Sequence, residues 1–141
     1  MKPLVVGPVT AERAPFLELS QAAWEAMIAG IRDGFFKSQS YARDAGEGGR
    51  LVFVSSPAAA RAIAGMTLEA VAGAFLTTVA QVAAVELAPW AVTANVVIPA
   101  LEPDSRTVQA VVRFLESPDA AGVTGAVIAA DGGYSVTKGT V

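Results

Sequence analysis

The sequence predicts a single α/β domain over residues 1–141, built on about four parallel strands with flanking helices. Short runs rich in β-branched residues alternate with longer segments in which apolar residues recur at three- and four-residue spacing. The run RLVFVSS at 50–56 is apolar without alternation up to its two serines, which is typical of a parallel strand buried on both faces. Strands separated by helices imply right-handed crossovers and therefore a parallel sheet.

The first third of the chain predicts a strand followed by a long helix. The strand is PLVVGPV at 3–9, with Pro3 and Pro8 marking its ends or an exposed edge. Ser20 is a candidate helix N-cap, and the glycine turn GEGG at 46–49 ends the helix. Five large apolar residues follow helical spacing: Trp24, Met27, Ile28, Ile31 and Phe35.

The rest of the chain repeats this alternation after the strand at 50–56 and a loop. A proline ends the first of the two helices in this part, and apolar side chains line one side of the second. Glycines follow the last strand. The predicted elements are, in order, a helix from about Thr67 to Ala88, a strand at 92–98, a helix at 105–117 and a strand within 124–133.

Composition narrows the functional classes. Hydrophobic residues make up 53% of the chain and charged residues only 16%, against about 25% charged in a typical domain. A surface so poor in charge favours contact with another protein. The net charge of −3 without a basic cluster argues against nucleic acid and anionic membranes as partners. Because Cys and His are absent, disulfides, thiolate nucleophiles, zinc sites and imidazole catalysis are excluded.

Targeting segments are not predicted. The residues Met1-Lys2-Pro3 precede only a few apolar residues before Gly7, which is unlike a signal peptide. The uncharged run at 70–85 contains polar residues and falls short of the roughly 20 apolar residues that span a membrane, so it predicts a buried helix. We therefore expect a cytoplasmic protein.

The predicted helix at 67–88 has an unusual surface. It carries no charge between Glu69 and Glu86, and its many alanines make it thin. A helix that is apolar all round is normally buried all round, and a four-stranded domain can cover only part of it. We expect a second subunit to pack here, through Ala70, Gly73, Ala74, Thr77, Gln81 and Ala84. The alternative is an alanine-rich helix that is half exposed and owes its composition to helix propensity.

Four segments together resemble the second half of a short-chain dehydrogenase/reductase. They are APFLELSQAAWEAMIAGIRDGFF, GGRLVFVSS, VELAPWAVTANVVIPA and VVRFLESPDAAGVTGAVIAADGGY. The resemblance runs from about Leu4 to Tyr134. It implies a partial Rossmann-like, doubly wound fold, in which these segments form the fourth to seventh strands of the family's seven-stranded sheet. The strand at 3–9 would then lack its usual neighbour, which leaves a free sheet edge.

The same resemblance implies that the cofactor half of the family fold is missing. The family's first half carries a Gly-rich turn at which backbone N–H groups and a helix N-terminus hold the cofactor pyrophosphate. This sequence has no G-x-G-x-x-G arrangement near its N-terminus, and reads VGPVT at 6–10 where the family has an Asn-Asn-Ala-Gly segment. We therefore expect no NAD(P) cofactor, and no metal, to be bound by this chain alone.

Three of the family's four catalytic positions hold residues of different chemistry. The serine falls on Ser56, but Glu69 stands where the tyrosine should be, 13 residues later. Gly73 replaces the lysine, and Ile31 replaces the asparagine of the preceding helix. A phenol needs the adjacent ammonium to act as an acid near neutral pH, so the resemblance implies a catalytically degenerate chain.

A different active site built from Ser56 and Glu69 is the alternative. Serine catalysis requires a base held by a third group, and no His or nearby Lys is present in the sequence. A carboxylate is a weak base unless it is buried. Ser56 is therefore interpreted as a strand-end cap or a remnant, and no catalytic residue is expected.

Three functional hypotheses remain. The first is a pseudoenzyme: a non-catalytic subunit that assembles with itself or with a full-length short-chain dehydrogenase, stabilising or regulating it. The second is an accessory subunit of a heteromeric NAD(P)-dependent oxidoreductase, which shapes the substrate pocket through Ser56 and the loop after Pro99 while the partner supplies the cofactor site, tyrosine and lysine. The third is a small protein that binds an apolar ligand in the cleft at the strand ends.

Overall fold

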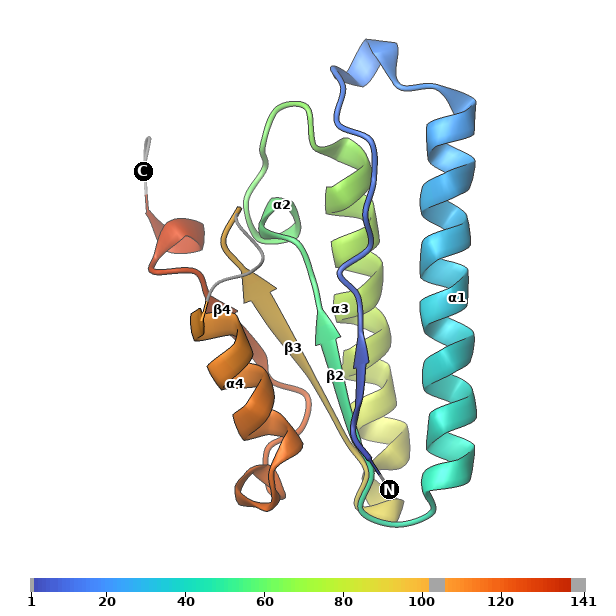
Figure 1. The fold of residues 1–141 in the computed structure, drawn as a ribbon, viewed down its shortest axis with the longest axis vertical. Coiled ribbons are helices and arrows are strands. Elements are labelled where there is room, and N and C mark those ends of the chain that lie inside the picture. Colours follow the sequence, from blue (N-terminus) through green and yellow to red (C-terminus); the bar gives the residue numbers. More distant parts are fainter. Residues whose placement is uncertain (1, 102–105, 138–141) are drawn as a thin grey trace.

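The computed structural model describes residues 2–101 and 106–137. Four parallel strands form one sheet in the order β1-β2-β3-β4. Helices α1 and α3 lie side by side on one face of this sheet, and α4 covers the other face (Figure 1). The main elements are β1 (Leu4–Val6), α1 (Gln21–Ala45), β2 (Arg50–Val54), α2 (Pro57–Ala60), α3 (Thr67–Leu87), β3 (Thr93–Pro99), α4 (Arg106–Glu116) and β4 (Val127–Ala130). The predicted α/β class and parallel sheet are confirmed.

The ends of α1 follow the predicted signals. The Ser20 hydroxyl accepts a hydrogen bond from the backbone N–H of Ala23 at 3.0 Å, so Ser20 is the N-cap. At the other end, Gly46 has φ +63° and Gly48 has φ +79°, in the left-handed region that glycine adopts without steric cost. The glycine turn therefore brings the chain back to start β2 beside β1.

Both faces of β2 are buried, which explains its unbroken apolar run. Leu51 and Phe53 pack against α3 through Leu76 and Ala80, in the main core of the molecule. The alternate residue Val52 points to the other face, into a second core beneath α4. Burying one such side chain is worth about 1.5–3 kcal/mol, so the two cores hold the sheet between its helices.

A buried amide holds the connection that leads into β4. Asn95 is fully buried in β3, where its side-chain N–H donates to the carbonyl of Val123 at 2.7 Å. Its side-chain oxygen accepts from the backbone N–H of Ala126 at 3.0 Å. Both halves of the amide are thereby paired, as a buried polar group requires. Asn95 therefore clamps β3 to the connection that leads into β4.

Strand β1 is shorter than predicted. The sequence predicts a strand over 3–9, but only Leu4–Val6 pair with β2. Gly7 has φ +87°, and a Cβ there would lie 2.5 Å from the carbonyl oxygen of Val54, while Pro8 has no N–H to donate. Those two residues end the pairing. Only β2 is hydrogen-bonded to β1, so the outer edge of β1 is open among the described residues.

Helix α3 is buried on one side only. Its inner residues, including Leu68, Ala72, Leu76 and Ala80, are buried against the sheet and α1. By length and composition the stretch Thr67–Trp90 could cross a membrane, and 33% of its most apolar window is buried within the chain. Its outer face carries no charge up to residue 85 and is exposed at Ala74, Thr78, Gln81, Val82 and Val85. The prediction of a buried helix holds for one face only.

Candidate functional site

A small cleft lies where the first three strands end, as expected for an open parallel sheet. It encloses about 180 Å³ and is called the strand-end cleft below. Its walls come from the segments that follow β1, β2 and β3 and from the first half of α3, and include Thr10, Arg13, Ser56, Glu69, Leu76 and Pro99. Residues 102–105, in the predicted loop after Pro99, lie outside the described part of the chain.

Ser56 is a helix cap. Its hydroxyl oxygen accepts a hydrogen bond from the backbone N–H of Ala58 at 3.1 Å and so begins α2, a short helix within a stretch predicted as loop. The side chain is buried, with 9% of the residue exposed. The sequence interpretation of Ser56 as a strand-end cap fits this geometry, and Pro57 at the first position of a helix could have signalled α2.

The neighbouring serine is tied to α3. Ser55 donates its hydroxyl hydrogen to the carbonyl oxygen of Gly73 at 2.9 Å. Thr77 shares this small network, since its hydroxyl lies 2.9 Å from the same carbonyl and 3.2 Å from the Ser55 hydroxyl. The network joins the end of β2 to the middle of α3. Its hydroxyls are therefore engaged in packing these two elements together.

Gly73 allows this close approach because it has no side chain. A Cβ at this position would lie 2.8 Å from the Ser55 hydroxyl oxygen, 2.8 Å from the backbone nitrogen of Ser56 and 3.0 Å from Cβ of Ala59. Contacts so short require the surrounding atoms to shift. Residues that follow β2 therefore occupy the space next to Gly73 that the side chain of the family's lysine would enter.

Glu69, at the family's tyrosine position, is held by an ion pair. The Arg13 side chain approaches both of its carboxylate oxygens, at 2.6 Å and 3.3 Å. The Glu69 side chain is 15% exposed and the Arg13 side chain 57% exposed. The pair fastens the segment after β1 to the start of α3, and both residues line the strand-end cleft. Arg13 was not singled out from the sequence, because nothing local links it to a residue 56 positions away.

Ile31 lies away from the cleft. It is buried, with 7% of the residue exposed, in an apolar cluster between α1 and α3 that includes Met27 and Leu68. Of the four family positions, Ser56, Glu69 and Gly73 line the cleft and Ile31 does not. A proton relay through this position has no polar group to use, because the side chain is a hydrocarbon.

One tyrosine of this chain has a lysine four residues later, although at a different place from the family motif. The pair is Tyr134 and Lys138, and Lys138 lies outside the described residues. The Tyr134 ring lies beneath the guanidinium of Arg61, whose central carbon is 4.9 Å from the ring centre. Arg61 also donates to the Tyr134 carbonyl at 3.0 Å. Tyr134 thus ties the C-terminal turn to the end of α2, and it is not part of the cleft lining.

Asp131, in the last glycine turn, is also held by hydrogen bonds within the chain. Asp131 accepts hydrogen bonds from the backbone N–H groups of Gly133 at 3.0 Å and Ser135 at 2.9 Å. Burial raises the pKa of Asp131, but hydrogen bonds from the side chain and backbone of Ser135 and the backbone of Gly133 outweigh it and lower the pKa below its ordinary 3.8. The carboxylate stabilises the turn in its charged form.

The strand-end cleft differs in size and lining from a usual ligand pocket. At about 180 Å³ the cleft is below the 300–1,000 Å³ of usual ligand pockets. The charged residues of its lining, Arg13 and Glu69, are paired with each other. No glycine-rich turn opens a helix beside it within the described residues. Among those residues, no group of three His, Cys, Asp or Glu is placed to hold a metal ion.

A larger hollow lies elsewhere, between the C-terminal halves of α1 and α3. It measures about 620 Å³ and is called the helix groove below. Its walls are mostly hydrocarbon, with charged groups at Arg43 and Glu86, and include Phe35, Ala42, Val82, Leu87 and Trp90. None of the six predicted interface residues lines this groove, which lies on a neighbouring side of α3.

The structure corrects two of the six predicted interface residues. Gly73 and Ala84 are buried inside this chain, Gly73 against Ser55 and Ala84 in the main core, so a partner cannot reach them. The error arose because alanine and glycine serve equally well for packing within a chain and between chains. Of the other four, Ala74 and Gln81 are exposed and Ala70 and Thr77 are half-buried, with the Thr77 hydroxyl directed to Ser55.

Comparison with known proteins places this geometry in a family. Over 96% of the chain, the structure superposes on a short-chain dehydrogenase/reductase from Serratia marcescens with TM-score 0.85 and 26% identity, covering 66% of that chain. An acetoin dehydrogenase from Enterobacter cloacae shares the fold over 100% of this chain and 67% of its own, with TM-score 0.86 and 24% identity. An acetoin dehydrogenase from Salmonella typhimurium gives TM-score 0.85, 22% identity and coverages of 97% and 66%.

The chain thus spans about two thirds of the length of these solved structures. No curated protein sequence matches it significantly. The family model described as enoyl-(acyl carrier protein) reductase matches residues 5–103, well over half of the 141 residues. The chain belongs to the short-chain dehydrogenase/reductase family.

Proposed function

We propose that this chain is a non-catalytic member of its family that acts as a subunit, assembling with itself or with a full-length short-chain dehydrogenase. The observation that carries the proposal is the packing at Gly73, where Ser55 and Ser56 fill the space a catalytic lysine would need. The two other groups that could take part in chemistry are also engaged. Ser56 caps α2, and Glu69 is paired with Arg13.

Assembly is supported by the exposed side of α3. The outer side of α3 exposes uncharged residues along its length, and Val82 and Val85 are 51% and 76% exposed. Trp90, at the end of this helix, is 53% exposed beside the helix groove. Exposed large apolar side chains on a helix without charges support a protein contact there. A partner on α1 and α3 would cover it.

The test is an activity and binding measurement on the purified chain. We expect no change in NADH or NADPH absorbance with a panel of ketones and alcohols, and no binding of either nucleotide by calorimetry. Ser56→Ala and Tyr134→Phe serve as controls. Turnover by the wild-type chain that either substitution abolishes would overturn the proposal, whereas turnover that neither substitution changes would indicate a contaminating enzyme.

A second candidate function is an accessory half of a heteromeric oxidoreductase. The open edge of β1 favours it, because a strand supplied by a partner could continue the sheet there, and Val5 is 40% exposed beside this edge. The test is co-expression with a full-length short-chain dehydrogenase from the same organism. In this case Ser56→Ala lowers the turnover of the complex and leaves its assembly intact.

The third hypothesis, an apolar ligand in the strand-end cleft, has less support. A cleft of about 180 Å³ holds only a very small ligand, and part of its wall is the Arg13–Glu69 ion pair. A compound that copurifies with the chain and is released by Leu76→Trp, which would fill the cleft, is the result that this hypothesis requires.

A further inference from the structure

A third hollow follows the outer edge of β1, between this strand and α1 (Figure 1). It encloses about 300 Å³, at the lower end of the range of usual ligand pockets, and is called the β1 edge site below. Val5 lines it although Leu4 and Val6 pack into the main core, so that the Val5 side chain points to the opposite face of the sheet. The site therefore lies at the edge of the strand. Its other walls come from β1, the segment after it and one side of α1: Val6, Gly7, Pro8, Val9, Thr10, Gly30, Asp33, Gly34 and Lys37.

The backbone groups of Val5 face this site. In a parallel strand, alternate residues direct their N–H and C=O groups to opposite neighbours. Ser55, just after β2, donates its N–H to the Val97 carbonyl of β3, so the residues of β2 that face β1 are the even-numbered ones, including Val52. Val52 lies opposite Val5 in the register of the two strands. The two neighbours of Val5 in β1 therefore turn toward β2, and the N–H and C=O groups of Val5 point outward.

The rest of this edge is protected by proline. Pro3 and Pro8 have no N–H to donate, and only Leu4–Val6 have strand geometry. A short edge strand flanked by proline resists indiscriminate pairing with other chains. An added strand can therefore pair over about three residues centred on Val5, and its side chains must supply the remaining affinity and the specificity.

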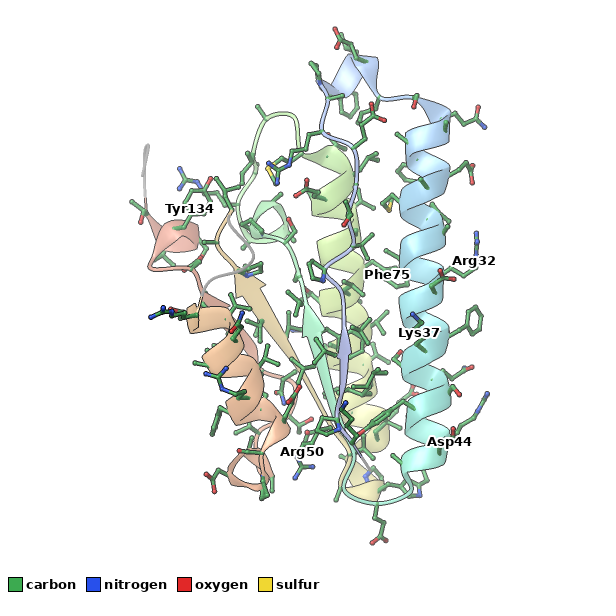
Figure 2. All side chains as sticks on the ribbon, in the orientation of Figure 1. Arg32, Lys37, Asp44, Arg50, Phe75 and Tyr134 are labelled. Carbon is green, nitrogen blue, oxygen red and sulfur yellow. The ribbon has the colours of Figure 1, made fainter. Side chains whose placement is uncertain are left out.

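Two charges on α1 are placed to select those side chains. Asp33 and Lys37 line the site, both are exposed, and neither forms a salt bridge with another described residue. Figure 2 shows Lys37 on the side of α1 toward β1, whereas Arg32 projects away from the rest of the molecule. The two charges are four residues apart, about 6 Å along the helix, and alternate residues of an extended strand lie about 6.6 Å apart on one face. A strand paired with Val5 therefore brings an acidic side chain to Lys37 and a basic one to Asp33 when these two stand two residues apart.

The residue between those two charged side chains meets a different surface. Because side chains alternate, it points to the α4 face of the sheet, next to Val5, which is 40% exposed. Neighbouring side chains on one face of a sheet pack together, so an apolar residue fits this position. The complementary segment is thus an extended tripeptide in which an apolar residue separates an acidic and a basic one. No such tripeptide occurs in the 141 residues of this chain, so a second copy does not supply it.

We propose that the β1 edge site binds an extended segment of another protein, in which an apolar residue lies between an acidic and a basic residue. The segment adds a short strand to β1, with its backbone paired to Val5 and its charged side chains at Asp33 and Lys37. This inference rests on the proposed role as a subunit. It states what the partner presents at the sheet edge, and it uses a surface separate from α3.

Short synthetic peptides that differ only in their central tripeptide test the charge selection. The three tripeptides are Glu-Val-Lys, Lys-Val-Lys and Glu-Val-Glu, and fluorescence anisotropy measures binding of each labelled peptide to the full chain. We expect the mixed peptide to bind about fivefold more tightly than the other two, because each of those brings one pair of like charges together. Lys37→Glu should move the preference to Lys-Val-Lys. Arg32→Glu is the matched control, because it changes the net charge equally on the same helix outside the site, and it should leave the preference unchanged.

A backbone substitution tests the strand pairing. Val5→Pro removes the outward N–H of this residue and no hydrogen bond to β2, a change that edge strands tolerate. We expect about tenfold weaker binding of the mixed peptide. Val5→Thr, which keeps the N–H and a similar shape, is the control and should bind as the wild type does. Circular dichroism checks that both variants are folded.

The results separate this inference from the proposed function. A preference for the mixed peptide that moves with Lys37→Glu and not with Arg32→Glu supports the inference. Absence of binding, a preference that Lys37→Glu leaves unchanged, or a folded Val5→Pro variant that binds as the wild type does overturns it, and the proposed subunit role then stands on the exposed side of α3. If Val5→Pro unfolds the chain, the charge substitutions decide alone. Oxidoreductase turnover would instead overturn the non-catalytic proposal and leave the β1 edge site standing.

Discussion

The strand-end cleft and the helix groove are the two hollows that matter most in this fold, and their polar groups differ in one respect. In the cleft, Ser55, Ser56 and Glu69 each have a partner within the chain. Beside the groove, Arg43 makes no salt bridge to a described residue, and large apolar side chains stay exposed. The comparison teaches that these polar groups of the cleft are used to hold the chain together, whereas side chains beside the groove remain exposed.

The largest expected effect comes from a side chain that supports the cleft from within the core. Leu76 is 1% exposed and packs between the sheet and α3, so Leu76→Ala should lower the free energy of unfolding by about 3 kcal/mol. On the exposed side of the same helix, Val85→Ala should change it by less than about 0.5 kcal/mol. Urea denaturation at equal protein concentration measures both. Equal losses would mean that the two faces of α3 are alike.

The second expected effect concerns Gly73, which stands at the position of the family's lysine. Gly73→Lys should lower the free energy of unfolding by about 2 kcal/mol, because its Cβ would overlap the Ser55 hydroxyl and the backbone of Ser56. Ala74→Lys, one residue further on the exposed side of α3, should cost less than about 0.5 kcal/mol. Thermal unfolding followed by circular dichroism compares the pair. If Gly73→Lys were as stable as Ala74→Lys, the cleft would have room for the family's lysine after all.

The third expected effect is the loss of a helix cap. Ser56→Ala removes the acceptor for the Ala58 N–H and should cost about 1 kcal/mol in stability. Ser56→Asp keeps an acceptor at the N-cap and should recover much of that loss. The measurement is the urea midpoint of the three proteins. A Ser56→Ala variant with wild-type stability would remove the structural explanation of this residue and reopen a chemical one.

The smallest expected effect is a dependence of stability on acid pH. The pKa of Asp131 is lower in the folded chain than its ordinary 3.8, so the charged carboxylate stabilises the fold above that value. This contribution should disappear as the pH falls through the lower folded-state pKa. Asp131→Asn should therefore reduce the loss of stability between about pH 4 and pH 2. Melting temperatures of both proteins across this range give the answer, and parallel curves would contradict it.

Much of the fold followed from local signals. Ser20 begins α1 and the glycines at 46–49 end it, because capping and left-handed backbone depend on a few neighbouring residues. The unbroken run Leu51–Val54 predicted burial on both faces, since parallel strands are covered on both sides. β1 proved shorter than predicted because its end depends on the distance from Gly7 to the carbonyl of Val54, a contact between separate strands.

The features of the candidate site also divide into those that the sequence determined and those that only the tertiary structure decided. The sequence by itself determined which family positions had changed, and it indicated a cap at Ser56 and an uncharged outer face on the helix at 67–88. Only the tertiary structure decided that Arg13 pairs with Glu69, that Gly73 is closed by Ser55, and that Gly73 and Ala84 face inward. The physical reason is the range of the interactions. Caps and helical periodicity act over a few residues, whereas ion pairs and close packing depend on where distant segments meet.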